Sequence, residues 1–216
     1  MKQLYIKVID WFKLNMPVAE SELNHSNAYE LLVAVILSAQ CTDKRVNIVT
    51  PALFLRFPDP LSLASSTYEE VFPYIQSISF PNNKTKHIIG MAKMLVSDYN
   101  SIVPSDTDEL QKLPGVGRKT ANVVASIIYD KPVIAVDTHV FRVSRRLGLS
   151  KGTTVEKVEE DLTNNIPAEY RAIAHHWLIL HGRYICVARK PKCNTCGLSN
   201  LCISVDDNLK YPSATS

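Results

Sequence analysis

The 216-residue sequence lacks a long apolar segment and an export signal. Its longest apolar run, residues 31–37, is far shorter than the ~20 residues that a membrane-spanning helix requires. Residues 1–12 lack the apolar core and the cleavage site of a signal peptide. We therefore expect a soluble, cytoplasmic protein whose length and 46% hydrophobic content suffice for a packed core.

Glycine is scarce, with 7 residues, and the alternation of apolar and polar residues that is typical of strands is nearly absent. Apolar residues instead recur at helical spacing, and residues 132–136 are expected to form a buried extended connector. The expected helices are an N-terminal one with Leu4, Val8, Trp11 and Phe12 on one face, then 29–40, 71–77, 84–99, a short one ending near Leu113, 120–129, 137–147, 154–166 and 167–181. The sequence therefore predicts an all-α fold.

Charge is nearly balanced overall but unevenly distributed. Residues 1–108 carry 9 basic and 11 acidic side chains (−2), whereas residues 109–216 carry 15 and 10 (+5). The excess concentrates at Arg118 and Lys119, at Arg142, Arg145 and Arg146, and in residues 183–192. This asymmetry favours a polyanionic partner such as nucleic acid, although basic clusters are more often solvated helix faces.

Four of the 5 cysteines lie close together near the C-terminus, with the spacing C-x6-C-x2-C-x5-C. They are Cys186, Cys193, Cys196 and Cys202. Such a cluster in a cytoplasmic chain predicts a metal centre rather than disulfides, and the spacing leaves zinc and a 4Fe–4S cluster equally open. The remaining Cys41 follows the buried helix and is most simply a small core residue.

The segment between the first two of these cysteines reads VARKPK, residues 187–192. Thiolate bonds at both ends would hold Arg189, Lys190 and Lys192 on a small rigid loop, where pre-ordered cations bind phosphates at a lower entropy cost. The alternative is that the metal centre only clamps this part of the chain and that the cations are solvated.

Residues 113–119, LPGVGRK, lie between two expected helices. Gly115 and Gly117 permit backbone conformations that other residues resist, and the following helix presents its first N–H groups and Arg118 to an anion. The pattern is typical of a helix–hairpin–helix motif that binds a DNA phosphate without reading the sequence. A simple glycine-rich connection between helices is the alternative.

Lys119 and Asp137 are the candidate catalytic residues. Lys119 stands in the first turn of a helix, where the positive end of the dipole disfavours an ammonium ion and favours an amine that can attack carbon. Asp137 begins another helix, so it is a candidate N-cap as well as a carboxylate that deprotonates the amine or stabilises a sugar cation. Taken alone, a lysine after such a hairpin is more often a phosphate contact.

The segments LPGVGRKTANVV, VDTHVFRVSRRLG and HHWLILHGRYIC, together with the cysteine pattern, resemble the bacterial endonuclease III family. The resemblance extends over residues 31–202. It implies two helical lobes with a DNA cleft between them. These are a six-helix barrel at 22–132, with the helix–hairpin–helix at about 107–126, and an iron–sulfur lobe formed by 1–21 and 133–216. The resemblance also implies one 4Fe–4S cluster on the loop 186–202.

The family consists of DNA glycosylases with abasic-site lyase activity, which implies that Lys119 is the nucleophile and Asp137 its acidic partner. The implied substrate is an oxidised or ring-saturated pyrimidine in damaged double-stranded DNA, bound by a monomeric, nucleoid-associated enzyme. Gln40 is then the residue that fills the gap left by the flipped nucleotide, and Ser38 and Asp43 lie near the pocket.

The chain departs from the family pattern in three places. ISFPNNK stands where the family usually has a leucine wedge, which makes Phe80 the wedge candidate. Cys41 replaces a small residue after the glutamine, and Gln111 stands where a carboxylate is often found.

Three other interpretations compete with this one. A monofunctional mismatch adenine glycosylase of the same superfamily lacks a lysine at the position of Lys119. A non-catalytic DNA-binding module would make Lys119 and Asp137 ordinary surface and capping groups. An electron-transfer protein would not need the hairpin.

Overall fold

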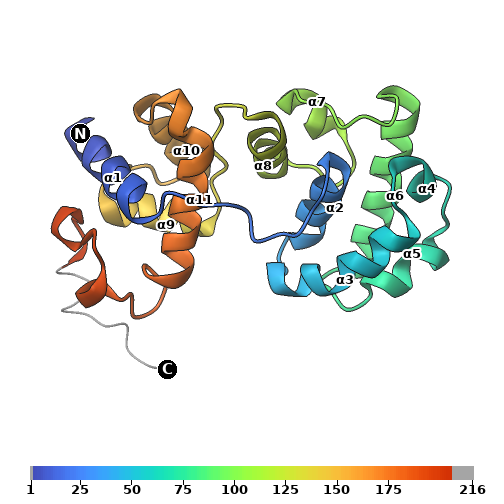
Figure 1. Ribbon diagram of the computed structural model, residues 1–216, viewed down its shortest axis with the longest axis horizontal. Coiled ribbons are helices and arrows are strands. Elements are labelled where there is room, and N and C mark those ends of the chain that lie inside the picture. Colours follow the sequence, from blue (N-terminus) through green and yellow to red (C-terminus); the bar gives the residue numbers. More distant parts are fainter. Residues whose placement is uncertain (1, 206–216) are drawn as a thin grey trace. The chain divides into compact units, whose positions relative to one another are not determined.

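The computed structural model describes residues 2–205, and every regular element within that range is a helix (Figure 1). The elements are α1 (Lys2–Asn15), α2 (Ala28–Ser38), α3 (Asp43–Arg56), α4 (Pro60–Ala64), α5 (Tyr68–Ile75), α6 (Pro81–Asp98), α7 (Thr107–Lys112), α8 (Arg118–Tyr129), α9 (Thr138–Leu147), α10 (Val155–Asn165), α11 (Ala168–Tyr184) and the 3-10 turns η1 (Cys193–Thr195) and η2 (Ser199–Leu201). The all-α prediction is confirmed. Within the described range, no helix is both long enough and apolar enough to cross a bilayer.

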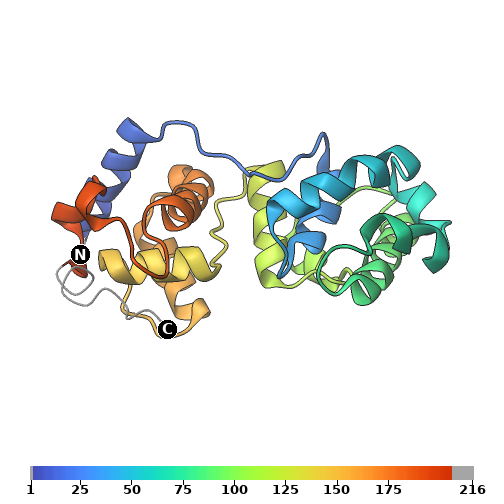
Figure 2. The same cartoon turned by 90° about the horizontal axis from the view of Figure 1, so that it is seen from below.

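The chain forms two compact units, which we call the central unit and the terminal unit. The central unit is Ser21–Asp130 and contains α2 to α8; the terminal unit is Met1–Glu20 with Lys131–Ser216 and contains α1, α9 to α11 and both 3-10 turns. The chain passes from one unit to the other after residue 20 and after residue 130 (Figure 2).

Polar side chains at the first positions determine where most helices begin. Each accepts a hydrogen bond from an N–H group in the first helical turn, a group that has no partner within the helix. These N-caps are Asn27, Thr42, Asp59, Thr67, Asp106, Asp137 and Thr154. Helix starts are therefore largely a local property of the sequence.

The core of the central unit is built around α2, as its apolar sequence predicts. Residues 31–37 are all buried, and α2 packs against α3, α6 and α8. A helix that is apolar all round needs neighbours on every side, which this arrangement supplies.

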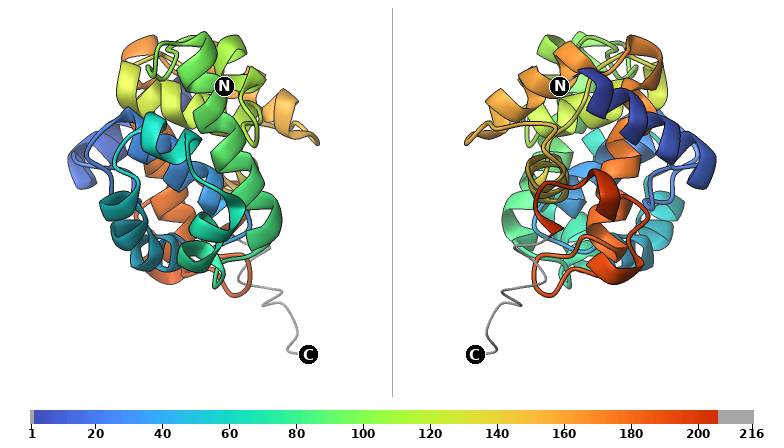
Figure 3. Two further views of the ribbon diagram at one scale, coloured as in Figure 1. Left: turned by 90° about the vertical axis from the view of Figure 1, so that its right-hand side faces the viewer. Right: turned by 90° about the vertical axis from the view of Figure 1, so that its left-hand side faces the viewer.

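In the terminal unit, the core joins α1 to the C-terminal helices. Phe12 of α1 stacks on Trp177 of α11 with ring centroids 5.5 Å apart, and the Trp177 indole donates a 2.7 Å hydrogen bond to the Met16 carbonyl. The right-hand view of Figure 3 shows α1 beside the last 3-10 turn, η2, with which it is in contact. The N-terminal helix thus anchors the cysteine-rich segment.

Two helices, α3 and α4, were not predicted. Pro51 lies inside α3, and proline inside a helix removes a hydrogen bond, so the sequence favours an interruption there. Burial of Val46, Val49 and Leu53 outweighs this cost. The connector at 132–136 is confirmed, since it is neither helix nor strand and its residues 134–136 are buried.

The two hairpin glycines differ in conformation, which corrects the expectation that both need special backbone angles. Gly115 has φ +81°, and a Cβ there would lie 2.8 Å from the Cβ of His87. Gly117 has φ −93° and ψ 176°, which any residue adopts, and an added Cβ would meet nothing within 4 Å. Only Gly115 is required by the shape of the loop.

We predict that Gly115→Ala lowers the free energy of unfolding by about 2 kcal/mol, because an L-residue there combines a left-handed conformation with a clash. Gly117→Ala is the matched control and should change it by less than about 1 kcal/mol. Urea unfolding followed by circular dichroism measures both values. Equal destabilisation by the two variants would contradict this account of the loop.

Candidate functional site

Lys119 lies in the first turn of α8, two residues after the N-cap Gly117. Gly117 makes no side-chain capping bond, so no N-cap oxygen occupies the N–H groups that begin the helix. The Lys119 side chain is exposed, so burial within the described structure does not desolvate the amine. The helix start therefore presents N–H groups and a lysine amine on one accessible surface.

Asp137 is the N-cap of α9. One carboxylate oxygen accepts a 2.8 Å hydrogen bond from the Val140 N–H, and the side chain is half-buried. Asp137 thus performs the capping role that the sequence predicted, and capping fixes the orientation of the carboxylate. Asp137 belongs to the terminal unit and Lys119 to the central unit.

The segment that leads to Asp137 is held by a residue that sequence reasoning missed. His175 of α11 is buried, and its Nδ1 lies 2.7 Å from the carbonyl oxygen of Ala135. Burial also lowers the pKa of the neighbouring His176 to about 4, so that side chain is neutral at physiological pH. The adjacent histidines in HHW were the available signal, but only the structure identifies the carbonyl that His175 contacts.

Gln40 and Phe80 share an unusual backbone conformation in the central unit. Gln40 follows α2 with φ 53°, and Phe80 precedes α6 with φ 55°. Both side chains are exposed, Phe80 with 59% of its surface accessible. Left-handed residues other than glycine are uncommon and mark positions where the surroundings determine the backbone.

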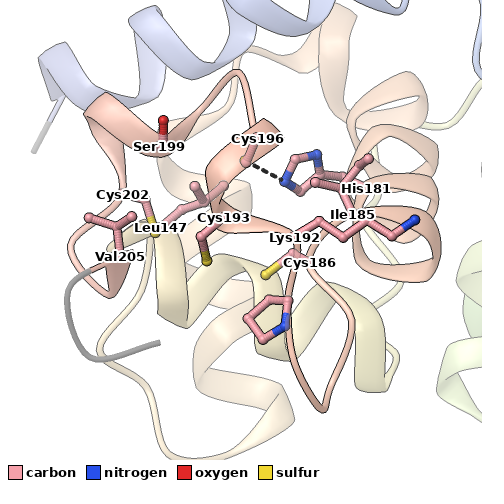
Figure 4. Close-up of a pocket in the computed structure, with 11 residues that line it drawn as sticks. Leu147, His181, Ile185, Cys186, Lys192, Cys193, Cys196, Ser199, Cys202 and Val205 are labelled. Atoms are coloured by element: carbon pink, nitrogen blue, oxygen red, sulfur yellow. Dashed lines mark hydrogen bonds between the residues drawn. The ribbon is translucent and has the colours of Figure 1, made fainter. Parts of the chain in front are cut away.

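The four C-terminal cysteines line one pocket with a volume of about 330 Å³, including the part open to solvent (Figure 4). All four are free thiols, so the disulfide alternative does not apply. Burial raises the pKa of the thiols of Cys196 and Cys202, and a bound cationic group would reverse that effect. Leu147, Ile185 and Pro191 supply an apolar wall.

Four cysteine thiols and no carboxylate line this pocket. Thiolates are ligands of iron–sulfur clusters as well as of structural zinc, so the donor set suits a cluster. The residues present therefore fit an iron–sulfur cluster.

Two arginines of α9 hold the start of the cluster loop, which we define as residues 186–202. Arg142 donates from Nε to the Cys186 carbonyl at 3.0 Å and from Nη2 to the Gly182 carbonyl at 2.8 Å. Arg146 donates from Nη1 to the Val187 carbonyl at 2.8 Å and from Nη2 to Ala188 at 3.0 Å. Both guanidinium groups bind backbone, which corrects the expectation that they belong to a basic surface.

The cations of the cluster loop itself are accessible. Arg189, Lys190 and Lys192 are all exposed, and Lys190 has φ 53°. With the loop backbone held by the α9 arginines, these side chains project from a fixed base.

Comparisons with known proteins agree with this geometry. A family model described as HhH-GPD superfamily base excision DNA repair protein matches residues 33–168, and the iron–sulfur binding domain of endonuclease III matches residues 186–202. Endonuclease III of Rickettsia conorii is 49% identical over 200 residues, which cover 93% of this chain and 95% of that protein. The Escherichia coli enzyme is 45% identical over 197 residues, 91% of this chain and 93% of its own.

The chain belongs to the endonuclease III family. A solved structure of a trapped endonuclease III–DNA covalent intermediate, an estranged-adenine complex, matches with a TM-score of 0.92 and 46% identity. The match covers 97% of this chain and 99% of that one. Family membership makes this chain a DNA glycosylase of base excision repair with abasic-site lyase activity and one 4Fe–4S cluster. The non-catalytic, electron-transfer and zinc alternatives are therefore rejected.

We predict that Cys186→Ser removes most of the bound iron and sulfide, because one cluster ligand is lost and the pocket no longer supplies four thiolates. Cys41→Ser should leave both contents unchanged, since Cys41 belongs to the central unit. Iron and sulfide analysis, with visible absorbance of the cluster, measures the difference. Full retention of iron by Cys186→Ser would remove this residue from the ligand set.

Proposed function

We propose that this chain removes oxidised or ring-saturated pyrimidines from duplex DNA and then cleaves the strand by β-elimination. In this proposal Lys119 is the nucleophile, Asp137 is its acidic partner, and the enzyme acts as a monomer on DNA of the nucleoid. The observation that carries it is an exposed lysine in the first turn of α8, directly after a hairpin whose Gly115 adopts a left-handed conformation. A relative 46% identical has been trapped as a covalent intermediate with DNA, which supports a covalent route.

The backbone of the damaged strand is held from both units in this proposal. Gly115, Gly117 and Arg118 of the hairpin bind one phosphate through N–H groups and charge, while the cations of the cluster loop bind others. We assign the hairpin lobe expected at 22–132 to the central unit and the cluster lobe to the terminal unit. Phosphate contacts of this kind position the DNA without reading its sequence.

Extrusion of the damaged nucleotide depends on Gln40 and Phe80. Phe80 enters the stack as an aromatic wedge, and Gln40 occupies the space that the flipped nucleotide leaves. Unstacking costs a few kcal/mol and costs less at a damaged base, which contributes to substrate selection.

In this proposal, the side chains of Lys119 and Asp137 carry out base excision and strand cleavage. The Lys119 amine donates its electron pair to form a bond with C1′. The bond from C1′ to the base breaks, and the base leaves with the electrons of the broken bond and takes up a proton. Asp137 accepts the proton from the Lys119 amine and stabilises positive charge on the sugar. The sugar ring opens as the bond from C1′ to the ring oxygen breaks, the nitrogen forms a Schiff base with C1′, and the ring oxygen takes up a proton. A proton then leaves C2′, and the bond from C3′ to its phosphate oxygen breaks, so that the phosphate leaves with the electrons of that bond. No step is an oxidation or a reduction that needs an external electron donor or acceptor.

We assign Cys186, Cys193, Cys196 and Cys202 as the ligands of the cluster. When bound, the cluster supplies a rigid, multiply bonded anchor for the loop that carries Arg189, Lys190 and Lys192. Because base excision and β-elimination balance without an oxidant or reductant, this anchoring role suffices for the reaction.

The nucleophile is tested with an abasic-site duplex and borohydride, which reduces the Schiff base to a stable adduct. We expect the wild type to form the adduct and Lys119→Gln to lower its yield at least about 10³-fold while DNA binding persists. Lys93→Gln, at an exposed position of α6, is the control and should trap normally. Undiminished trapping by Lys119→Gln would assign the nucleophile elsewhere, and failure of cluster-loaded wild type would overturn the lyase proposal.

Substitutions at Asp137 separate its capping role from its chemical role. Asparagine caps helices as well as aspartate does, so Asp137→Asn should change the free energy of unfolding by less than about 0.5 kcal/mol, whereas Asp137→Ala should cost about 1 kcal/mol. Both variants should lower the single-turnover excision rate by about 10²-fold or more, because each loses the carboxylate. Near-normal excision by Asp137→Asn would leave Asp137 with a capping role alone.

A further inference from the structure

Lys84 of α6 is a buried lysine that the reaction does not use. Its side chain has only 5% of its surface exposed, and its amine donates hydrogen bonds to the carbonyl oxygens of Leu37 at 2.8 Å and Ala39 at 2.6 Å. Its backbone N–H donates the ordinary i→i−4 helical hydrogen bond to the carbonyl oxygen of Phe80, the N-cap of α6, at 3.2 Å. The Lys84 side chain therefore ties the start of the helix that Phe80 precedes to the end of α2, where Gln40 follows.

The two side-chain bonds stabilise the turn that carries Gln40. The last carbonyl groups of a helix have no partner within it, and a cation near that end is favourable. Ala39 has φ −56° and ψ 115°, so the chain leaves the helix there and its carbonyl oxygen points away from the helical ladder. Gln40 then adopts φ 53°, a conformation that persists only where neighbouring contacts impose it.

Burial of an amine is costly, which indicates that packing alone does not explain Lys84. Burial lowers the pKa of Lys84, and an uncharged side chain such as methionine would fill a similar volume without that penalty. The amine supplies something methionine lacks, namely donors that hold two carbonyl groups at fixed positions.

The rest of α6 supports the same arrangement in the central unit. A Cβ added to Gly90 of α6 would lie 3.3 Å from Cγ of Pro114, and His87 of α6 lies against Gly115. The helix that begins after Phe80 and binds the Gln40 turn thus also packs on the hairpin. The residues of α6 therefore set the spacing between the Gln40 turn, Phe80 and the hairpin.

We propose that Lys84 is a positioning residue that holds Gln40 and Phe80 in a fixed relation, and thereby sets how efficiently a base-paired lesion is extruded from the duplex. This inference rests on the proposed function, because it presumes that Gln40 and Phe80 act on the DNA stack. Lys84 itself contacts neither the reacting atoms nor the substrate.

The test compares two substrates with the same oxidised pyrimidine, one base-paired in a duplex and one in an unpaired bulge. In single-turnover assays, Lys84→Met should lower the excision rate on the paired lesion by about 10- to 100-fold, since small misplacements have effects of that size. The rate on the unpaired lesion should fall less than about threefold, because little extrusion is required there. The matched control, Lys86→Met at an exposed position of the same helix, should leave the ratio of the two rates unchanged.

The ratio of the two rates within one preparation cancels any loss of folded protein, so reduced stability of Lys84→Met does not obscure the result. Lys84→Arg keeps the charge and the hydrogen-bond donors, so its ratio of the paired-lesion rate to the unpaired-lesion rate should lie between those of Lys84→Met and the wild type.

A double-mutant cycle with Gln40→Ala adds a second test: Lys84→Met should lower the paired-lesion rate by a smaller factor in that background. An equal loss on both substrates, or full additivity in the cycle, would overturn the positioning role. Wild-type inactivity on both lesions would instead overturn the proposed function.

Discussion

Cationic side chains that bind backbone carbonyl groups hold the functional segments of this protein in place. In the terminal unit, Arg142 and Arg146 bind carbonyl groups at the end of α11 and at the start of the cluster loop. The same helix, α9, begins at Asp137. A helix is stiff and rises 1.5 Å per residue, so the position of the Asp137 carboxylate is tied to the loop that carries Arg189, Lys190 and Lys192, the cations that we propose bind DNA.

The hydrogen bonds of Arg142 and Arg146 to backbone carbonyl groups change how the basic composition of the C-terminal half is interpreted. The C-terminal half carries an excess of five positive charges, but two of its arginines are committed to backbone groups, and burial lowers the pKa of Arg142. The charge count therefore overstates the number of cations available to a polyanion, and the accessible cations of the cluster loop, Arg189, Lys190 and Lys192, project from a backbone whose start these arginines hold. For phosphate binding, a small number of pre-positioned cations is favoured over many mobile ones, because less side-chain entropy is lost on binding.

The sequence predicts the local features of the fold well and the long-range ones poorly. Helix starts such as Asp106 and Asp137 follow from capping chemistry, and the buried α2 follows from its composition. Helix α3 was missed because packing overrides Pro51, a contribution that no local pattern contains. The motifs identified the candidate site residues, but not Lys84 and His175, whose partners are carbonyl groups 45 and 40 positions away. Carbonyl groups are present at every residue, so no sequence pattern marks which one is bound.

The exposed aromatic ring at the start of α6 is suited to the wedge role that we propose for Phe80. Phe80 has 59% of its surface accessible and a left-handed backbone, so the free protein gains little from burying it. Stacking of a base on an aromatic side chain contributes about 1–3 kcal/mol. Extrusion of a base from the stack costs a few kcal/mol. The two terms are of the same size, so a ring held in a fixed position can offset most of the extrusion cost, whereas a mobile ring would first lose conformational entropy. In the wedge role that we propose for Phe80, the Lys84 side chain, which fixes the start of α6 against the end of α2, therefore contributes to extrusion as well as to the fold.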